Sequence, residues 1–320
     1  MKTIKRFLKW LFIILISVFI ILSVIPYFFS NHLKEAPLKP YENSVFFEFN
    51  HTRFHFRIFV PKHIKHKALL VHGFSGSTFS FRNNYSSLVN NNTLVVAIDM
   101  PAFGYSDKSE HADYTDSNKI NAIHFLLQHI DKLTNSIKWN LIGHSMGGII
   151  IGQYASTYNE QTKSLIFIDG LPFTQTPHSF FQKLILYPPL LKWSDLILEN
   201  YFLNQKSFSK LLTSAYGRDA DAESSYGYMK PFEIKGSGSA ILRMGSNYSY
   251  SYINDSIIDS TQKLIIWGNQ DKWVPIMSAA DYLKKPQTKS LIIEDAGHCP
   301  METHPNEVNN AITDFISNLD

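Results

Sequence analysis

Residues 141–148 read LIGHSMGG and join two apolar stretches of different character. Residues 140–142 suit a buried strand, whereas residues 149–154 suit an apolar helix. Glycine at positions 143 and 147 allows the close backbone approach that a sharp strand-to-helix turn requires. Such a turn lifts Ser145 above the sheet, at a helix amino terminus where backbone N–H groups favour negative charge. By itself, a serine between glycines is also typical of a plain turn.

Strands and helices alternate on both sides of this turn. Short runs rich in Leu, Ile and Val are typical of parallel strands covered by helices on both faces, and they occupy residues 68–72, 93–98, 140–142, 164–168, 263–267 and 290–293. Helical spacing of apolar residues is found at 120–130 and 308–319. Near alternation of apolar and polar residues at 44–60 indicates a strand pair at a sheet edge. The pattern predicts a doubly wound, mostly parallel α/β sheet.

One interval breaks this rhythm. About ninety residues separate the predicted strand ending near Asp169 from the strand starting at Lys263, and compact domains rarely hold structureless loops of that size. We therefore expect residues 171–262 to form an inserted, mostly helical cap within an α/β domain that spans residues 44–320.

The amino terminus has a different composition. Residues 1–9 form a basic flank with four positive charges, residues 10–29 carry no charge, and about 20 apolar residues suffice to cross a bilayer. A cleaved signal peptide is the alternative, but its apolar region is usually about 7–15 residues long and ends in small residues. We favour a retained single-pass anchor in the cell membrane, followed by a linker at 30–43. The basic flank predicts a cytoplasmic amino terminus and an extracytoplasmic domain.

Charge and cysteine content exclude several classes of function. The formal net charge is +3, and the basic flank alone supplies four positive charges. The remainder is therefore close to neutral, so a nucleic-acid partner is not expected. Cys299 is the only cysteine, so no intramolecular disulfide can form, and no Cys and His cluster has zinc-ligand spacing. We expect no metal and no organic cofactor, and we interpret Cys299 as a buried or incidental thiol.

Three further motifs each follow a predicted strand. His72-Gly73-Phe74 ends the strand at 68–72, Asp271 lies within WGNQDKWVP at 267–275, and His298 ends DAGH at 295–298. The carboxyl ends of strands in an open α/β sheet meet where ligands bind. Ser145, Asp271 and His298 are therefore expected at one edge of the sheet. Asp169 follows another strand and is the rival carboxylate.

Together, these motifs resemble the α/β-hydrolase family over nearly all of residues 44–320. The order Ser, Asp, His matches the family's catalytic triad, and residues 99–106, DMPAFGYS, are similar to a segment found in many members, with Ala102 in place of a glycine. The resemblance implies Ser145 as nucleophile, His298 as general base and Asp271 as the acid that orients the histidine. It also implies an oxyanion hole formed by the backbone N–H groups of Phe74 and Met146. A serine nucleophile argues against dehalogenase and epoxide hydrolase chemistry, which uses an aspartate.

The expected activity is hydrolysis of carboxylic esters by an acyl-enzyme mechanism. Many aromatic and aliphatic residues in the predicted cap favour an apolar or lipid-like acyl substrate. Hydrolysis of a carbon–carbon bond or a thioester with the same triad remains open as an alternative. A non-catalytic binding domain of the same fold would be expected to lose a triad position, and none is lost here.

Overall fold

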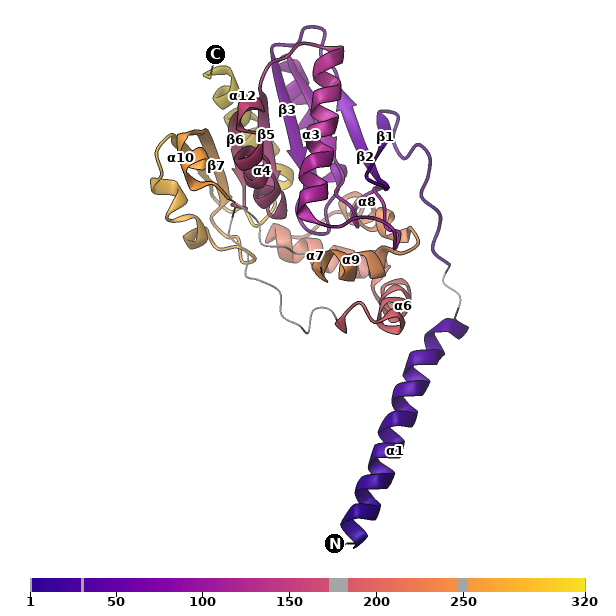
Figure 1. The fold of residues 1–320 in the computed structure, drawn as a ribbon. Helices are drawn as coiled ribbons and strands as arrows, with labels where there is room; N and C mark the ends of the chain where they lie inside the picture. Colours follow the sequence, from indigo (N-terminus) through magenta and orange to yellow (C-terminus); the bar gives the residue numbers. More distant parts are fainter. Residues whose placement is uncertain (1, 30–31, 173–183, 247–252, 320) are drawn as a thin grey trace.

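The computed structural model describes residues 2–29, 32–172, 184–246 and 253–319 (Figure 1). Its described part contains an eight-stranded sheet with the order β1-β2-β4-β3-β5-β6-β7-β8. The strands are β1 (Ser44–Phe49), β2 (Thr52–Phe59), β3 (His66–Val71), β4 (Thr93–Ile98), β5 (Trp139–His144), β6 (Thr162–Ile168), β7 (Gln262–Gly268) and β8 (Thr288–Ile293). Strands β1 and β2 pair antiparallel, β2 pairs antiparallel with β4, and all later pairs are parallel.

Helices cover both faces of this sheet, which explains the apolar runs in the sequence. Helices α3 (Asp116–Leu133) and α4 (Met146–Thr157) pack together on one face, and α2 (Tyr85–Asn90) and α12 (Pro305–Ser317) pack together on the other. Every residue of β3, β4 and β5 is consequently buried. The predicted fold class, a doubly wound and mostly parallel α/β sheet, is confirmed.

The chain between β6 and β7 contains further helices. They are α6 (Pro188–Ile197), α7 (Gln205–Tyr216), α8 (Ala222–Met229), α9 (Ser237–Ser246) and α10 (Asp255–Ser260). Helices α6 to α9 lie between the sheet and the amino-terminal helix in Figure 1, whereas α10 packs on α4. We use the word cap for this insertion with the predicted limits 171–262, of which 173–183 and 247–252 lie outside the described residues.

Helix α1 (Lys2–Val24) extends away from the domain and continues into a short 3₁₀ helix, η1 (Ile25–Phe28). Residues Thr3–Phe28 are long and apolar enough to cross a membrane, with a mean hydropathy of 2.8 in the most apolar window. A signal sequence near the amino terminus can meet the same criteria of length and hydropathy. The helix includes the basic flank predicted at residues 1–9, apart from Met1, which is not described.

Asp99 directly follows β4 and organises the loops around the carboxyl edge of the sheet. Its Oδ2 accepts hydrogen bonds from Nδ1 of His55 (2.7 Å) and from the N–H of Tyr105 (2.8 Å), and its Oδ1 accepts from the N–H of Thr78 (2.6 Å). Burial alone favours the neutral acid, but the charge and hydrogen bond of His55 outweigh burial and lower the pKa of Asp99. One carboxylate therefore joins β2, β4 and the loop that follows β3.

Replacing Asp99 with Ala is expected to reduce the free energy of unfolding by about 3 kcal/mol or more, because three buried donors lose their acceptor. Asp107 is a suitable control, since its half-buried carboxylate also accepts hydrogen bonds from two backbone N–H groups. Asp107→Ala should cost about 1 kcal/mol. Urea denaturation of both variants and the wild type measures the difference.

The same comparison has a defined pH dependence. The folded-state pKa of Asp99 is lowered, so its stabilisation is complete above the unfolded value of about 3.9 and is lost as the pH falls through the folded value. The difference in unfolding free energy between the wild type and Asp99→Ala should therefore be constant from about pH 7 to 5 and shrink below about pH 4. A difference that grows in acid would contradict an ionised Asp99.

Candidate functional site

The turn from β5 into α4 places Ser145 in a strained conformation, with φ 49° and ψ −118°. Two glycines permit it, because a Cβ on Gly147 would lie 2.1 Å from the carbonyl oxygen of Val71, and a Cβ on Gly143 would lie 2.5 Å from the carbonyl group of Gly147. A non-glycine residue at positive φ costs on the order of 1–3 kcal/mol and persists only where surrounding packing imposes it. The turn thus has the geometry of a nucleophile elbow.

The loop after β3 lies against this turn. A Cβ on Gly73 would be 3.0 Å from Cβ of Ser145 and 2.8 Å from Nδ1 of His144. Phe74 follows this glycine, and its ring packs edge-on against Phe103 at a centroid distance of 5.2 Å. Met146, the other predicted oxyanion donor, is the first residue of α4. Both predicted donors therefore flank Ser145 in the chain or in space.

His298 and Asp271 are joined by a short hydrogen bond. Nδ1 of His298 lies 2.7 Å from Oδ2 of Asp271, although the two residues belong to different loops, after β8 and β7. The side chains of both residues are almost completely buried. Within the described part of the chain, Nε2 of His298 makes no hydrogen bond. The imidazole is therefore oriented by the carboxylate through one nitrogen, and the other nitrogen is available.

Asp271 is held as a carboxylate. Its Oδ1 accepts hydrogen bonds from the backbone N–H groups of Trp273 (2.8 Å) and Val274 (3.0 Å). Burial opposes ionisation, but the hydrogen bond and charge of His298, with these two N–H groups, lower the pKa of Asp271. The indole of Trp273 stacks on the ring of His298 at 5.4 Å and covers the pair.

Asp169, the rival carboxylate, lies beside this pair but is in a different state. Its Oδ1 accepts a hydrogen bond from the N–H of Gly268 (3.0 Å), and no hydrogen bond between Asp169 and His298 is found among the described residues. Complete burial and the neighbouring charge of Asp271 raise the pKa of Asp169 well above its ordinary value. Burial therefore favours the protonated form of Asp169, and His298 pairs with Asp271.

His144 connects the serine turn to the histidine loop. Its Nε2 donates a hydrogen bond to the carbonyl oxygen of His298 (2.7 Å), and the two rings lie 5.0 Å apart. Burial lowers the pKa of His144 to about 3, so the ring is neutral and acts as a donor only through this nitrogen. Cys299 is buried, and burial raises the pKa of its thiol, as expected for a cysteine without a nucleophilic role.

The cap is tied to the loop that carries His298. The N–H of His298 donates to the carbonyl oxygen of Ala215 on α7 (2.6 Å). Four residues further on, the buried Glu302 accepts hydrogen bonds from Tyr216 on α7 (2.9 Å) and from Tyr228 on α8, and it pairs with Arg82. Sequence reasoning missed this cluster, because its members are scattered along the chain and match no motif.

A second Ser, His and Asp set is also present. His55 bonds to Asp99 through Nδ1 and to Oγ of Ser44 through Nε2 (2.8 Å). The rings of Phe46 and Tyr105 pack against His55, which is completely buried. Its backbone is regular strand, without a glycine turn or a helix start beside the serine. This set has the bonding pattern of a triad but none of the surroundings that expose a nucleophile.

Asp169, Asp271 and His298 place ligand atoms within 4.8 Å of one another, which is close enough to hold a metal ion. The chemistry of this donor set fits a metal poorly. Nδ1 of His298 and Oδ2 of Asp271 already bond to each other, and Asp169 is kept neutral by burial.

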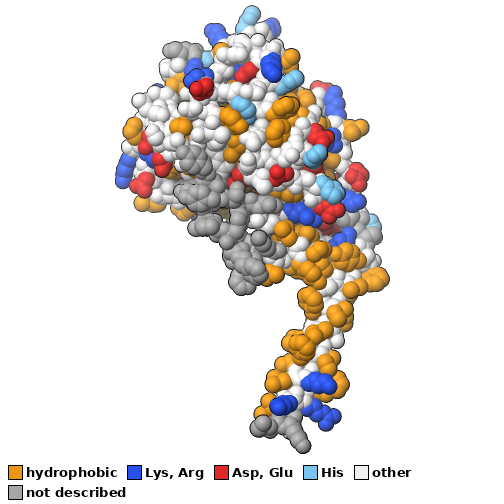
Figure 2. Space-filling view, in the orientation of Figure 1, with side chains coloured by type: hydrophobic (Ala, Val, Ile, Leu, Met, Phe, Trp, Pro, Cys, Tyr) orange, Lys and Arg blue, Asp and Glu red, His pale blue; other side chains and the backbone are white. Residues whose placement is uncertain are grey.

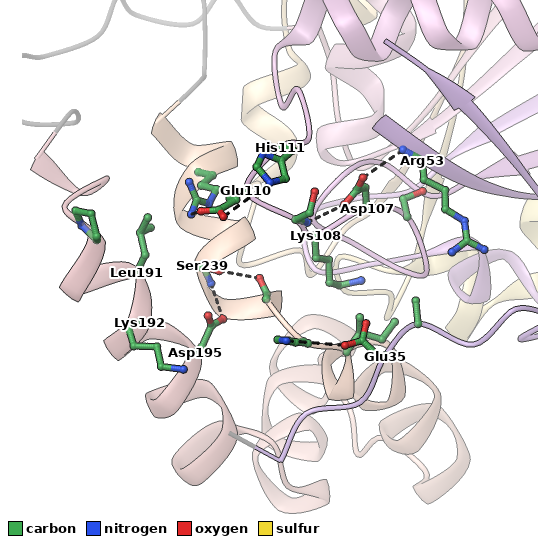
Figure 3. A pocket seen from close by; sticks show the side chains of 18 of the residues that line it. Glu35, Arg53, Asp107, Lys108, Glu110, His111, Leu191, Lys192, Asp195 and Ser239 are labelled. Atoms are coloured by element: carbon green, nitrogen blue, oxygen red, sulfur yellow. Dashed lines mark hydrogen bonds and ion pairs between the residues drawn. The ribbon is translucent and has the colours of Figure 1, made fainter. Parts of the chain in front are cut away.

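A cavity of about 700 Å³ lies elsewhere, between the linker, α6, α9 and the loop at residues 106–111 (Figure 3). Charged side chains of both signs line it, including Lys108, Lys192 and Asp195, and Asp195 accepts a hydrogen bond from the N–H of Ser239 (2.9 Å). Neither Ser145 nor His298 lines this cavity. It is therefore separate from the candidate active site.

Comparison with known proteins agrees with this geometry. The chain is 28% identical over 279 residues to monoacylglycerol lipase ABHD6 of Mus musculus, covering 81% of this chain and 77% of the relative. It is 25% identical over 249 residues to the uncharacterized hydrolase YugF of Bacillus subtilis, covering 77% of this chain and 88% of the relative.

Solved structures share the fold. A membrane phospholipase A described as a bacterial virulence factor has a TM-score of 0.62 at 20% identity, covering 98% of this chain and 99% of its own. The serine hydrolase CarC of carbazole degradation has a TM-score of 0.64 at 19% identity, covering 86% of this chain and 98% of its own. The family profile described as alpha/beta hydrolase fold matches residues 69–305. The chain therefore belongs to the α/β hydrolase family and has lipases among its relatives.

Proposed function

We propose that this protein is a serine hydrolase of carboxylic esters with Ser145, His298 and Asp271 as its catalytic triad. The hydrogen bond of 2.7 Å between His298 and an ionised Asp271, next to the strained turn of Ser145, is the observation that carries the proposal. This hydrogen bond orients the imidazole and leaves its Nε2 available at the edge of the sheet above which the turn lifts the side chain of Ser145.

The first half of the reaction forms an acyl-enzyme. Nδ1–H of His298 donates to Asp271, so Nε2 is the basic nitrogen and takes the proton from Oγ of Ser145 as this oxygen attacks the ester carbonyl. The developing oxyanion is bound by the backbone N–H groups of Phe74 and Met146. His298 then gives its proton to the departing alcohol, and the carbonyl re-forms as the ester C–O bond breaks.

The second half returns the enzyme. His298 takes a proton from water, which attacks the acyl carbon, and then protonates Oγ of Ser145 as the acid leaves. Asp271 stabilises the imidazolium in both halves without taking its proton. The scheme needs no metal and no organic cofactor.

An apolar acyl chain is the preferred substrate feature. The many aromatic and aliphatic residues of the cap favour it, as does the similarity to relatives named monoacylglycerol lipases. The solved structures include a meta-cleavage product hydrolase of Pseudomonas fluorescens, but at 16% identity it supports the fold alone. No observation favours carbon–carbon or thioester cleavage over ester cleavage.

We further propose that α1 is a retained single-pass anchor of the cell membrane, with the hydrolase domain outside the cytoplasm. The candidate span is almost entirely exposed, with 6% of its most apolar window buried, as expected of a helix that contacts lipid. Its basic residues lie at the end remote from the domain, which by the positive-inside bias is the cytoplasmic end (Figure 2).

Ser145→Ala is expected to lower kcat for p-nitrophenyl esters by roughly 10⁴-fold or more, because no other group can form the acyl-enzyme. Ser44→Ala is the matched control, since Ser44 also bonds to a histidine that bonds to an aspartate. It should leave kcat within about threefold of the wild type. An ester hydrolase activity that survives Ser145→Ala and is lost in Ser44→Ala would reverse the assignment.

Asp271→Asn and Asp169→Asn distinguish the two carboxyl groups. Asp271→Asn removes the charge that orients and stabilises the imidazolium, so kcat should fall by about 10⁴-fold. Burial favours the protonated form of Asp169, and the amide has the same shape and keeps an acceptor for Gly268, so kcat should change by less than about tenfold. Equal losses in the two variants, measured in one assay on folded protein, would contradict the separate roles.

A further inference from the structure

The cap makes direct contacts with α1 inside its apolar span. Tyr187, at the start of α6, donates a hydrogen bond from its hydroxyl to Oγ of Ser23 (2.8 Å), and its ring stacks on Phe19 at 5.8 Å. Trp193 of α6 donates from Nε1 to the carbonyl oxygen of Leu22 (2.9 Å). These contacts fix α6 against the end of α1 that is nearer the domain (Figure 1).

The contact at Leu22 has a chemical reason. In a continuous α-helix the carbonyl of Leu22 would accept from the N–H four residues later, but that residue is Pro26, which has no N–H. A carbonyl without a donor is costly in lipid. The indole of Trp193 supplies the missing donor, so the proline in α1 and the tryptophan in the cap are complementary.

The depth of these contacts follows from helix geometry. The apolar span ends at Phe28, and the cap touches α1 at Phe19, Leu22 and Ser23. At about 1.5–2 Å of rise per residue, these positions lie roughly 8–15 Å inside the end of the span. If α1 crosses a bilayer, the side of α6 that contacts α1 therefore lies below the end of the apolar span, near the interface where tyrosine and tryptophan are enriched.

One side of α6 and of the following turn, η4 (Leu198–Phe202), is suited to that depth. We call Leu190, Trp193, Ile197 and Tyr201 the α6 stripe, because a spacing of three and four residues places them on one side of the helix. Leu190 and Tyr201 are 47% and 73% exposed. The opposite side, with Leu191 and Asp195, is buried against α9 and the rest of the cap.

The linker fastens the same part of the cap a second time. Lys34 forms a short parallel bridge with Ile234, and its ammonium group pairs with Glu233 (2.6 Å). The N–H of His32 donates to Glu199 of η4 (2.6 Å). The linker and α1 thus contact the cap at separate places, and hydrophobic side chains continue from α1 onto the adjoining face of the domain (Figure 2).

We propose that the α6 stripe docks into the outer leaflet of the lipid bilayer beside α1 and turns the cap into the membrane-facing side of the domain. A lipid surface is the occupant because the stripe is continuous with the membrane helix and its tryptophan bonds to that helix. The cap also covers the edge of the sheet where His298 lies. The candidate site therefore faces the membrane and receives an amphiphilic ester from the adjacent leaflet, a consequence that rests on the proposed function.

Docking is tested by depth-dependent fluorescence quenching in the full chain. Cysteine replaces Leu190 on the stripe, Phe12 within α1, or Leu133, which is exposed at the far end of α3. Each variant carries a fluorescent label in phosphatidylcholine nanodiscs, without a quencher or with lipids that bear a quencher either near the headgroup or along the acyl chain. Wild-type protein, whose Cys299 is buried, measures background labelling.

An interfacial helix lies about 5–10 Å deep, so the label at residue 190 should be quenched roughly threefold and the label at residue 133 not at all. Quenching at residue 12 but not at residue 190 overturns the proposal. So does an absence of quenching at residue 12, because α1 is then not in the bilayer. The label at residue 190 could instead be shielded from water without being quenched by lipid, to a degree that increases with the density of protein in the nanodiscs. That result would indicate contact with a second copy of the chain, and it would also overturn the proposal.

Substrate delivery is tested with Leu190→Glu and the matched control Leu133→Glu. Leu190→Glu should leave hydrolysis of a soluble short-chain ester unchanged and lower the rate on a monoacylglycerol embedded in the nanodiscs by about tenfold, since a charge replaces a lipid-contacting side chain. Leu133→Glu should change neither rate. Equal rates of Leu190→Glu and wild type on the embedded lipid overturn delivery from the leaflet. A wild type that hydrolyses no ester refutes the proposed function instead, while the quenching result stands independently.

Discussion

The close approach of backbone segments around Ser145 is the constraint on which the rest of the structure depends. The amino terminus of α4 lies so near β3 that no side chain fits at Gly147, and the loop after β6 lies so near the serine that no side chain fits at Gly170. This packing maintains a positive φ at Ser145 that an isolated peptide would not adopt. It raises the hydroxyl at the edge of the sheet to which the other loops bring their side chains.

Two carboxyl groups at this edge differ in state because their partners differ. Asp271 has an imidazole and two backbone N–H groups as partners, whereas Asp169 has one backbone N–H and the neighbouring carboxyl group of Asp271. Burial and the charge of Asp271 therefore raise the pKa of Asp169, whereas the partners of Asp271 lower the pKa of Asp271. Two adjacent buried carboxylates would repel each other. Ionisation of Asp271 therefore favours the protonated form of its neighbour Asp169.

The cap connects the candidate site to α1. On one side, a backbone carbonyl of α7 accepts a hydrogen bond from the N–H of His298, and Glu302 accepts hydrogen bonds from tyrosines of α7 and α8. On the other side Trp193 of α6 donates a hydrogen bond to the carbonyl of Leu22, whose α-helical donor would be the N–H that Pro26 lacks. The histidine loop and the proposed anchor are thus linked through one inserted segment, so the position of the site relative to a bilayer follows from cap packing.

The sequence by itself determined the α/β fold class and the places where polar motifs follow strands. A continuous apolar run indicates a strand whose two faces are both buried, and the run at 93–98 coincides with β4. Only the tertiary structure decided that His298 bonds to Asp271 rather than Asp169, that Ser44, His55 and Asp99 form a second hydrogen-bonded set, and that Trp193 contacts α1. Local periodicity encodes which face of an element is buried, whereas these contacts join residues far apart in the chain. Their choice depends on distances and directions that no local pattern contains.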